Sequence, residues 1–198
     1  MTFHRYYQAL CLTVMLAISA CTTPDPAVTL PSVTFQHLPP LNLAVARIDV
    51  VRAYASPLKA PNIEHKMETT PTQALSVWAN DRLKAVQPSG GHQARLTIDT
   101  ASIVETPLKR TEGIRGAFTT DQSHRYDLDL RATIEILDRN GQRIGHATAR
   151  INRNRTMPEN ATLNELHSAW FDLMENGLQE FNKEMELNMR HFLKDWVQ

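Results

Sequence analysis

Three residues near the middle of the chain have side chains that could together cleave an ester or amide bond. Asp121, Ser123 and His124 lie within four positions of one another, and a serine, a histidine and a carboxylate are the parts of a nucleophilic triad. Residues so close in one loop seldom point at one another, and a triad usually takes its members from distant parts of the chain. We therefore expect no catalytic residues and no enzyme activity.

Histidine is the other residue type that could do chemistry here. No two of the eight histidines have the i, i+4 spacing that places a pair of metal ligands on one face of a helix. The HExxH motif of zinc proteases, the GxSxG nucleophile elbow and the phosphate loop are absent from the sequence. We expect no metal and no cofactor. The histidines are His4, His37, His65, His92, His124, His146, His167 and His191.

The two cysteines carry the most specific signal in the sequence. Cys11 and Cys21 are the only ones, so no disulfide framework can form further along the chain. Residues 9–20 are mainly apolar, but about a dozen residues would span only about 18 Å as a helix, well short of a ~30 Å hydrocarbon core. A basic start, a short apolar run and small residues before the cysteine are typical of a cleaved secretory signal.

The stretch Ile18-Ser19-Ala20-Cys21 resembles the lipobox of bacterial lipoproteins. This resemblance implies that residues 1–20 are a signal peptide that is removed, and that Cys21 becomes the first residue and carries acyl chains, palmitate among them. The lipid would then anchor the protein to a membrane. The alternative is an ordinary signal peptide in which the cysteine has no role.

Residues 21–40 contain five prolines and few large apolar side chains. Such a composition favours the extended polyproline conformation, with ~3.1 Å per residue. We predict that this segment is a tether which holds the domain up to about 60 Å from the membrane. A single folded domain should follow, over residues 41–198.

Length and composition agree with one globular domain. Of the 198 residues, 42% are hydrophobic and 21% are charged, close to the averages of soluble globular proteins. The formal net charge is zero, so the overall charge gives no reason to expect nucleic acid as a partner.

The first half of the domain has the pattern of a strand, a helix and a strand. Residues 41–54 are rich in β-branched and aliphatic side chains and predict a buried strand. Thr70 is followed by a proline and, three positions on, by a glutamine, as at a capped helix start. Apolar side chains then recur at helical spacing up to Val86. Residues 94–104 alternate as a strand whose phase slips after Ile98, as at a bulge.

The second half has the pattern of a strand, a strand and a helix. Residues 126–136 alternate between apolar and polar, as in an antiparallel strand with one wet face. Residues 138–141 predict a tight turn, and residues 143–155 return as the hairpin partner. A capping box at Thr162 begins a last helix that runs to the C-terminus. The sequence thus predicts an α+β, two-layer sandwich of order β-α-β-β-β-α, with a mainly antiparallel four-stranded sheet and two helices on one face.

We expect the last helix to be longer than the sheet. About 35 residues at 1.5 Å each give roughly 50 Å, more than a sheet of average strands covers. Part of the helix should therefore overhang or kink, with Gly177 as the weak point. Apolar side chains on an overhang have nothing of their own chain to cover them. We predict that this helix end binds a partner through Met189, Phe192, Leu193 and Trp196.

Residues 105–125 form the longest segment without a clear element. A link of about twenty residues is uncommon in a compact domain unless it has a function. Its cations and apolar side chains suit a ligand or partner that is anionic and partly apolar. The binding residues predicted there are Lys109, Arg110, Arg115 and Phe118. The alternative is that the flanking strands extend into this segment as a long hairpin with solvated charges.

The lipobox, the tether and the element order resemble small envelope lipoproteins of Gram-negative bacteria. These include the auxiliary lipoproteins of intermembrane lipid-transport systems and the lipoprotein plug of the lipopolysaccharide export channel. The stretches PLKRTEG at 107–113 and FTTDQ at 118–122 are similar to uncharacterised lipoproteins of this kind. Thr22 follows the cysteine where aspartate would favour retention in the inner membrane, so the resemblance implies the outer membrane.

The same resemblance implies a role. It predicts a non-enzymatic accessory or docking subunit of an envelope transport or assembly complex, facing the periplasm and also contacting anionic lipid. Two alternatives stay open at the level of the sequence. One is a periplasmic enzyme that uses the segment at 105–125, and the other is a peptidoglycan-binding module.

Overall fold

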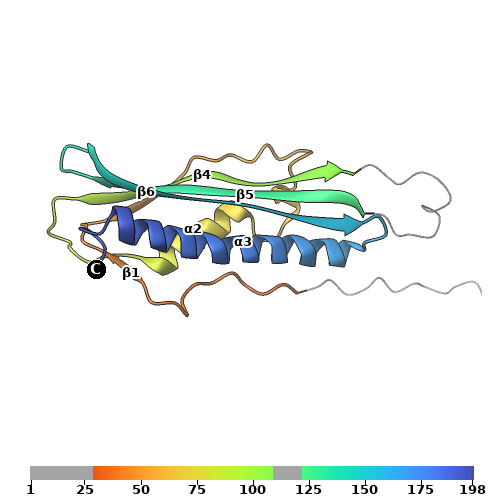
Figure 1. Cartoon of the computed structure of the whole chain (residues 1–198), viewed down its shortest axis with the longest axis horizontal. Coiled ribbons are helices and arrows are strands. Elements are labelled where there is room, and N and C mark those ends of the chain that lie inside the picture. The colour runs from red at the N-terminus through yellow and green to blue at the C-terminus, as the bar shows by residue number, and fades with distance from the viewer. Residues whose placement is uncertain (1–28, 109–121) are drawn as a thin grey trace, which may run out of the picture.

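The computed structural model describes residues 29–108 and 122–198. Within these residues four strands form one sheet and two α-helices lie together on one of its faces (Figure 1). The strands of this sheet, in the spatial order β2-β4-β5-β6, are β2 (Ile48–Arg52), β4 (Gln93–Pro107), β5 (Gln122–Leu137) and β6 (Arg143–Pro158). The helices are α2 (Pro71–Arg82) and α3 (Leu163–Phe192). The α+β class and the two-layer arrangement predicted from the sequence are confirmed.

Alternation along β5 decides which face of the sheet is buried. Leu128, Leu130 and Ile134 point into the core and are at most 1% exposed, whereas the polar residues between them lie on the open face. On that open face Asp129 Oδ2 accepts a hydrogen bond from Arg150 Nη2 of β6 at 2.7 Å. In β4 the register shifts just after residue 98, so the predicted bulge is confirmed.

The large sheet is mixed, because β2 runs parallel to β4 while the other pairs are antiparallel. The chain passes through α2 between β2 and β4, and two neighbouring strands joined by a helical crossover run parallel. The strand predicted over residues 41–54 is divided in two. Its first part, β1 (Leu41–Leu43), pairs with β3 (Leu83–Ala85) in a small parallel sheet. Because β3 follows α2 directly, the helix ends at Arg82 and not near Val86, where the apolar spacing predicted its end.

A buried polar contact joins α2 to α3. Both helices begin at the predicted capping boxes. Asn182 Oδ1 of α3 accepts hydrogen bonds from Trp78 Nε1 and Arg82 Nε of α2, each at 2.9 Å. Arg82 also forms an ion pair with Glu186. Since Arg82 is only 1% exposed, these partners offset the cost of burying its charge.

The predicted overhang of the last helix is wrong. α3 has 30 residues, which at 1.5 Å per residue give about 45 Å. β5 and β6 have 16 residues each, which extend over about 50 Å at ~3.3 Å per residue. These strands are far longer than the five or six residues of an average strand. The sheet therefore runs along the whole of α3 (Figure 1).

Gly177 is a point of close approach between α3 and the sheet, and the predicted kink there is not found. The helix is continuous from Leu163 to Phe192. A Cβ atom at position 177 would overlap Cδ2 of Leu128 on β5. The absence of a side chain thus lets the helix lie against the strand.

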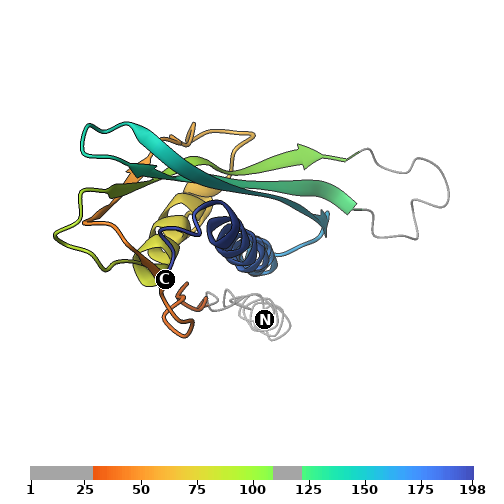
Figure 2. The same ribbon diagram turned by 60° about the vertical axis from the view of Figure 1, so that its left-hand side comes forward.

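Residues 30–38, which we call the strap, run along the helix layer on the side away from the sheet (Figures 1 and 2). Phe35 is 6% exposed and belongs to the core, because burying an aromatic side chain removes a large apolar area from water. Asp81 of α2 accepts a hydrogen bond from the Phe35 N–H at 2.8 Å. The packed domain therefore begins before the predicted boundary at residue 41, inside the segment predicted as a tether.

A buried carboxylate fastens the connection between β2 and α2 to the sheet. Glu64 is 1% exposed. Its Oε1 accepts hydrogen bonds from Asn62 Nδ2 and from the backbone N–H of Ile103 on β4, both at 2.9 Å. Tyr54 Oη and Ser56 Oγ donate two more, also at 2.9 Å. Burial raises the pKa of the Glu64 carboxyl, but these hydrogen bonds outweigh burial and hold the pKa below its ordinary value.

Candidate functional site

The segment predicted to be functional begins and ends at one end of the domain. β4 and β5 leave the described residues there, and we call it the hairpin end. β4 extends to Pro107 and β5 begins at Gln122, as the hairpin interpretation predicts for the flanks of this segment. The predicted binding residues and one member of the suspected triad lie outside the described residues, and the chain that carries them leaves and re-enters the described structure at this end. They are Lys109, Arg110, Arg115, Phe118 and Asp121.

Ser123 and His124, at the start of β5, do not have the geometry of a catalytic pair. Ser123 Oγ lies 2.8 Å from Nδ1 of His124, whereas Nε2 of the same ring lies 3.9 Å from Glu105 Oε1. The second distance is too long for a hydrogen bond. Ser123 is also only 7% exposed, so a substrate would have little access to its hydroxyl. Among the residues that the structure describes, Glu105 therefore does not orient the imidazole as the carboxylate of a nucleophilic triad would.

Glu105 instead joins the hairpin to the helix layer. Tyr126 Oη donates a hydrogen bond to Glu105 Oε1 at 2.8 Å, and the Tyr126 ring packs edge-on against Trp170 of α3, with the ring centroids 5.5 Å apart. Burial and the neighbouring carboxylate raise the pKa of the Tyr126 hydroxyl, so this group stays protonated and continues to donate at neutral pH. These contacts join β4, β5 and α3 at the base of the hairpin end.

A cavity of about 360 Å³ lies beside Trp170, between the strap, α3 and the connection that precedes α2. Leu30 lines it from the strap, and His167 lines it from α3. His65 lines it from the short 3-10 turn η2 (Glu64–Lys66). Within the described part of the chain, Trp170 Nε1 is buried and has no hydrogen-bond partner. Leu30 therefore lies beside the first ten residues of α3. This part of the helix is the part closest to the hairpin end.

The packed strap shortens the distance over which a lipid on Cys21 could act. Cys21 itself lies outside the described residues. Eight residues lie between it and Leu30, and even a fully extended chain spans only about 30 Å from Cys21 to Leu30. The sequence alone predicted about twice that reach, because it counted residues 30–40 as free tether.

The predicted partner surface at the end of α3 is divided between the core and the surface. Met189 and Leu193 are 0% exposed, so their prediction as surface contacts is wrong, and the long sheet explains why they are covered. Trp196 is partly buried and packs edge-on against His92, with the ring centroids 6.5 Å apart. Phe192 is 59% exposed. Of the four predicted residues, Phe192 alone presents most of its side chain to solvent.

The strap is the functional feature that sequence reasoning missed. Its signal is present in the spacing of Val33, Phe35 and Leu38 within the proline-rich segment. Three apolar residues over six positions do not have the length or period of a strand or a helix. The contact that fixes them, with Asp81, is 46 positions away in the sequence.

Two further findings concern the described ranges alone. No helix within residues 29–108 and 122–198 is both long and apolar enough to cross a membrane. Over the same two ranges, no three side chains of histidine, cysteine, aspartate or glutamate gather into a group that could hold a metal ion.

No protein-family model and no curated protein matches the chain. Solved structures similar to it include rare lipoprotein B from Shewanella oneidensis, at 12% identity and a TM-score of 0.38, over 71% of this chain and 91% of that one. A minor lipoprotein from Acinetobacter baumannii has 17% identity and a TM-score of 0.32, over 74% and 94% of the two chains. A lipoprotein from Neisseria meningitidis has 13% identity and a TM-score of 0.23, over 68% and 99%. All three are bacterial lipoproteins.

Proposed function

We propose that this protein is an outer-membrane lipoprotein that faces the periplasm, is anchored through Cys21 and serves as a docking subunit of an envelope transport or assembly complex. The observation that best supports an anchor at Cys21 close to the domain is the packing of the strap. The strap leads the chain from β1 back toward the hairpin end (Figure 1) and leaves only eight residues between Leu30 and the lipobox cysteine. The domain is then held within about 30 Å of the membrane, with its hairpin end nearer.

This orientation gives the hairpin end a role. The chain between Leu108 and Gln122 carries Lys109, Arg110 and Arg115, and it starts from the part of the domain nearest the anchor. A cation close to an anionic bilayer contributes about 1 kcal/mol to binding. We propose that these residues contact anionic head groups beside the lipid anchor, and that Phe118 enters the interfacial region.

The same orientation turns the far end of α3 toward the periplasm. Phe192 lies about 45 Å along the helix from Leu163, at 1.5 Å per residue. The Phe192 side chain is 59% exposed, and Leu187, also near this end, is 67% exposed. Exposed aromatic side chains of this kind are typical anchors of protein interfaces. We propose that Phe192 docks on a protein subunit of the envelope complex.

The anchor is tested by fractionating cells that carry Cys21→Ala. This variant should leave the membrane fraction, because one peripheral patch without acyl chains binds only weakly. A Cys21→Ala protein that stays membrane-bound after a high-salt wash would show that the anchor lies elsewhere.

Docking is tested by cross-linking the lipidated protein in cells and isolating it from membranes. Phe192→Asp should reduce recovery of the partner at least tenfold, since a central interface aromatic contributes about 2 kcal/mol or more. Leu163→Asp is the matched control, because Leu163 is 64% exposed but lies at the other end of the same helix. Equal recovery with Phe192→Asp, or no partner recovered by the unmodified protein, would contradict docking at this surface.

Lipid contact is tested with vesicles and the chain that carries Cys21→Ala. The double variant Lys109→Glu, Arg110→Glu should bind vesicles containing phosphatidylglycerol at least tenfold more weakly than its parent, because two attractive charges become repulsive. Binding to vesicles of neutral lipid should not change. Sedimentation of the same protein with isolated cell-wall sacculi, but not with vesicles, would favour the peptidoglycan-binding alternative.

A further inference from the structure

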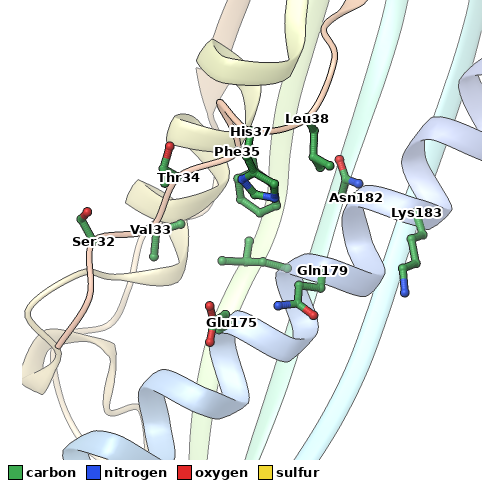
Figure 3. Close-up of a pocket in the computed structure, with 11 residues that line it drawn as sticks. Ser32, Val33, Thr34, Phe35, His37, Leu38, Glu175, Gln179, Asn182 and Lys183 are labelled. Carbon is green, nitrogen blue, oxygen red and sulfur yellow. The ribbon is translucent and has the colours of Figure 1, made fainter.

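A groove of about 410 Å³ separates the strap from α3, on the side of the helix layer away from the sheet (Figure 3). Its lining is apolar along the middle. Val33, Phe35 and Leu38 line it from the strap, and Leu178 lines it from α3. Phe35 and Leu178 are almost completely buried, at 6% and 1% exposed, so they form a fixed floor. This groove is separate from the cavity beside Trp170 and lies further from the hairpin end.

One edge of the groove is a row of polar side chains. Glu175, Gln179 and Lys183 follow one another at i, i+4 and i+8 on α3, so they share one face of the helix. Over the described ranges none of these three side chains has a hydrogen bond or an ion pair, and the charge of Lys183 acts only at a distance, lowering the pKa of Glu180. By contrast, Glu180 on the same helix is paired with Arg153. The row is therefore free to meet a ligand.

The two ends of the groove differ in charge. Leu38, Asn182 and Lys183 lie at one end, and Val33 and Glu175 lie toward the other (Figure 3). The first end offers a cation and the second an anion, so an anionic head group is attracted to the first and repelled from the second.

Asn182 adds a directed donor at the cationic end. It is 8% exposed, and its Oδ1 already accepts from Trp78 and Arg82. These two donors fix the orientation of the amide. Its Nδ2 group has no partner among the residues that the structure describes, although the side chain lines the groove. An amide donor that lines a groove and has no protein partner can donate to an oxygen acceptor of a ligand.

We propose that this groove binds a long-chain carboxylate, with the carboxylate at Lys183 and Asn182 and the acyl chain lying over Phe35 and Leu178 toward Val33. The volume fits such a chain, because 410 Å³ holds roughly a dozen groups of about 30 Å³ each. A mainly apolar pocket with a few convergent polar groups is the usual form of a small-molecule site. The groove does not depend on the lipid anchor or on docking. A result that refutes ligand binding in the groove therefore leaves the proposed function untouched, and the reverse also holds.

The test is calorimetric titration of dodecanoate, below its micelle concentration, into the chain that carries Cys21→Ala, which needs no detergent. We expect saturable binding of one dodecanoate per chain. Octanoate, four methylenes shorter, should bind at least 50-fold more weakly, because each buried methylene contributes about a fourfold factor. Gln179→Trp places a bulky side chain at the exposed edge of the groove and should weaken dodecanoate binding at least tenfold.

Two controls make the result specific. Leu187→Trp makes a similar change at an exposed position of α3 that does not line the groove, and it should leave binding unchanged. Lys183→Gln should weaken dodecanoate about tenfold but leave the neutral dodecanol unaffected, and circular dichroism should show every variant folded. Absence of saturable dodecanoate binding, or equal binding by Gln179→Trp and its parent, would overturn the site. Equal loss of dodecanoate and dodecanol binding in Lys183→Gln would overturn the assigned position of the carboxylate.

Discussion

A single substitution on α2 should loosen the strap, because one carboxylate, that of Asp81, accepts three of the hydrogen bonds that hold it. Asp81 Oδ2 accepts hydrogen bonds from the Phe35 N–H at 2.8 Å and from Thr34 Oγ1 at 3.3 Å. Asp81 Oδ1 accepts a longer one from Gln36 Nε2 at 3.4 Å. A hydrogen bond to a charged acceptor contributes about 1.5–3 kcal/mol, and long exposed ones contribute less. Asp81→Ala should therefore lower the free energy of strap opening by about 2 kcal/mol.

Native-state hydrogen exchange at the Phe35 amide measures this opening directly. A loss of about 2 kcal/mol corresponds to roughly 30-fold faster exchange, at 1.36 kcal/mol for each factor of ten. Amides in the middle of β5 should keep their protection, since the strap opens locally without unfolding the sheet. Asp81→Asn is the matched control. It keeps one oxygen acceptor for the Phe35 N–H and should accelerate exchange by less than about fivefold.

The exchange rate of the Phe35 amide also tests how long the free tether is. With the strap released, the chain from Cys21 to Leu41 spans up to about 65 Å, instead of the about 30 Å allowed when Leu30 is packed. If the Phe35 amide of the unmodified protein exchanges as fast as in a free peptide, the strap is not packed and the shorter reach is wrong. If Asp81→Ala leaves Phe35 exchange unchanged, the carboxylate is not what holds it.

Three further predictions concern stability, each measured by urea unfolding. Glu64→Gln should lower the free energy of unfolding at pH 7 by about 2–3 kcal/mol, because its hydrogen bonds lose a charged acceptor. The pKa of Glu64 in the folded protein lies below its ordinary value of 4.5. The ionised carboxylate therefore stabilises the fold fully above pH 4.5, and this stabilisation is lost as the pH falls through the folded-state pKa. The difference in unfolding free energy between the parent and Glu64→Gln should thus shrink at about pH 3. Gly177→Ala should cost about 1–3 kcal/mol through overlap with Leu128, and a gain from better helix propensity would show that the core yields there. Arg153→Ala should change the free energy by less than about 1 kcal/mol, because its ion pair with Glu180 is exposed, and a loss above twice that value would contradict this.

Elements that depend on neighbouring residues could be predicted from the sequence. The capping boxes at Thr70 and Thr162, the bulge after Ile98 and the inward face of β5 are all read from residues a few positions apart. Caps and alternation act through local hydrogen bonds and side-chain direction, which do not require knowledge of the fold.

Features that depend on distant partners could not be predicted. The length of the sheet was underestimated because β4 continues to Pro107 and β5 already begins at Gln122. These ends lie in a segment whose apolar and polar residues do not alternate. That error led to the predicted overhang, and with it to the assignment of Met189 and Leu193 as surface residues. The strap was missed because Phe35 is held by Asp81, on another element. Of the predicted site residues that lie in the described ranges, Phe192 alone has a largely exposed side chain.

The proposed function requires that the lipidated domain stands with its hairpin end toward the membrane. Cys11 is lost with the signal peptide and the Cys21 sulfur is occupied by lipid under this proposal, so an introduced cysteine is the one free thiol. Two exposed positions suit labelling. Thr156 pairs with Arg125 near the hairpin end, and Asn140 lies in the turn at the other end of β5 and β6 (Figure 1). The two positions are separated by about 40 Å along the strands.

The measurement is quenching of a fluorophore on Thr156→Cys or Asn140→Cys by an acceptor attached to lipid head groups, with the lipidated protein in vesicles. The proposed orientation predicts strong quenching of the label at position 156 and little at position 140. Equal quenching at the two positions, or stronger quenching at position 140, would contradict it.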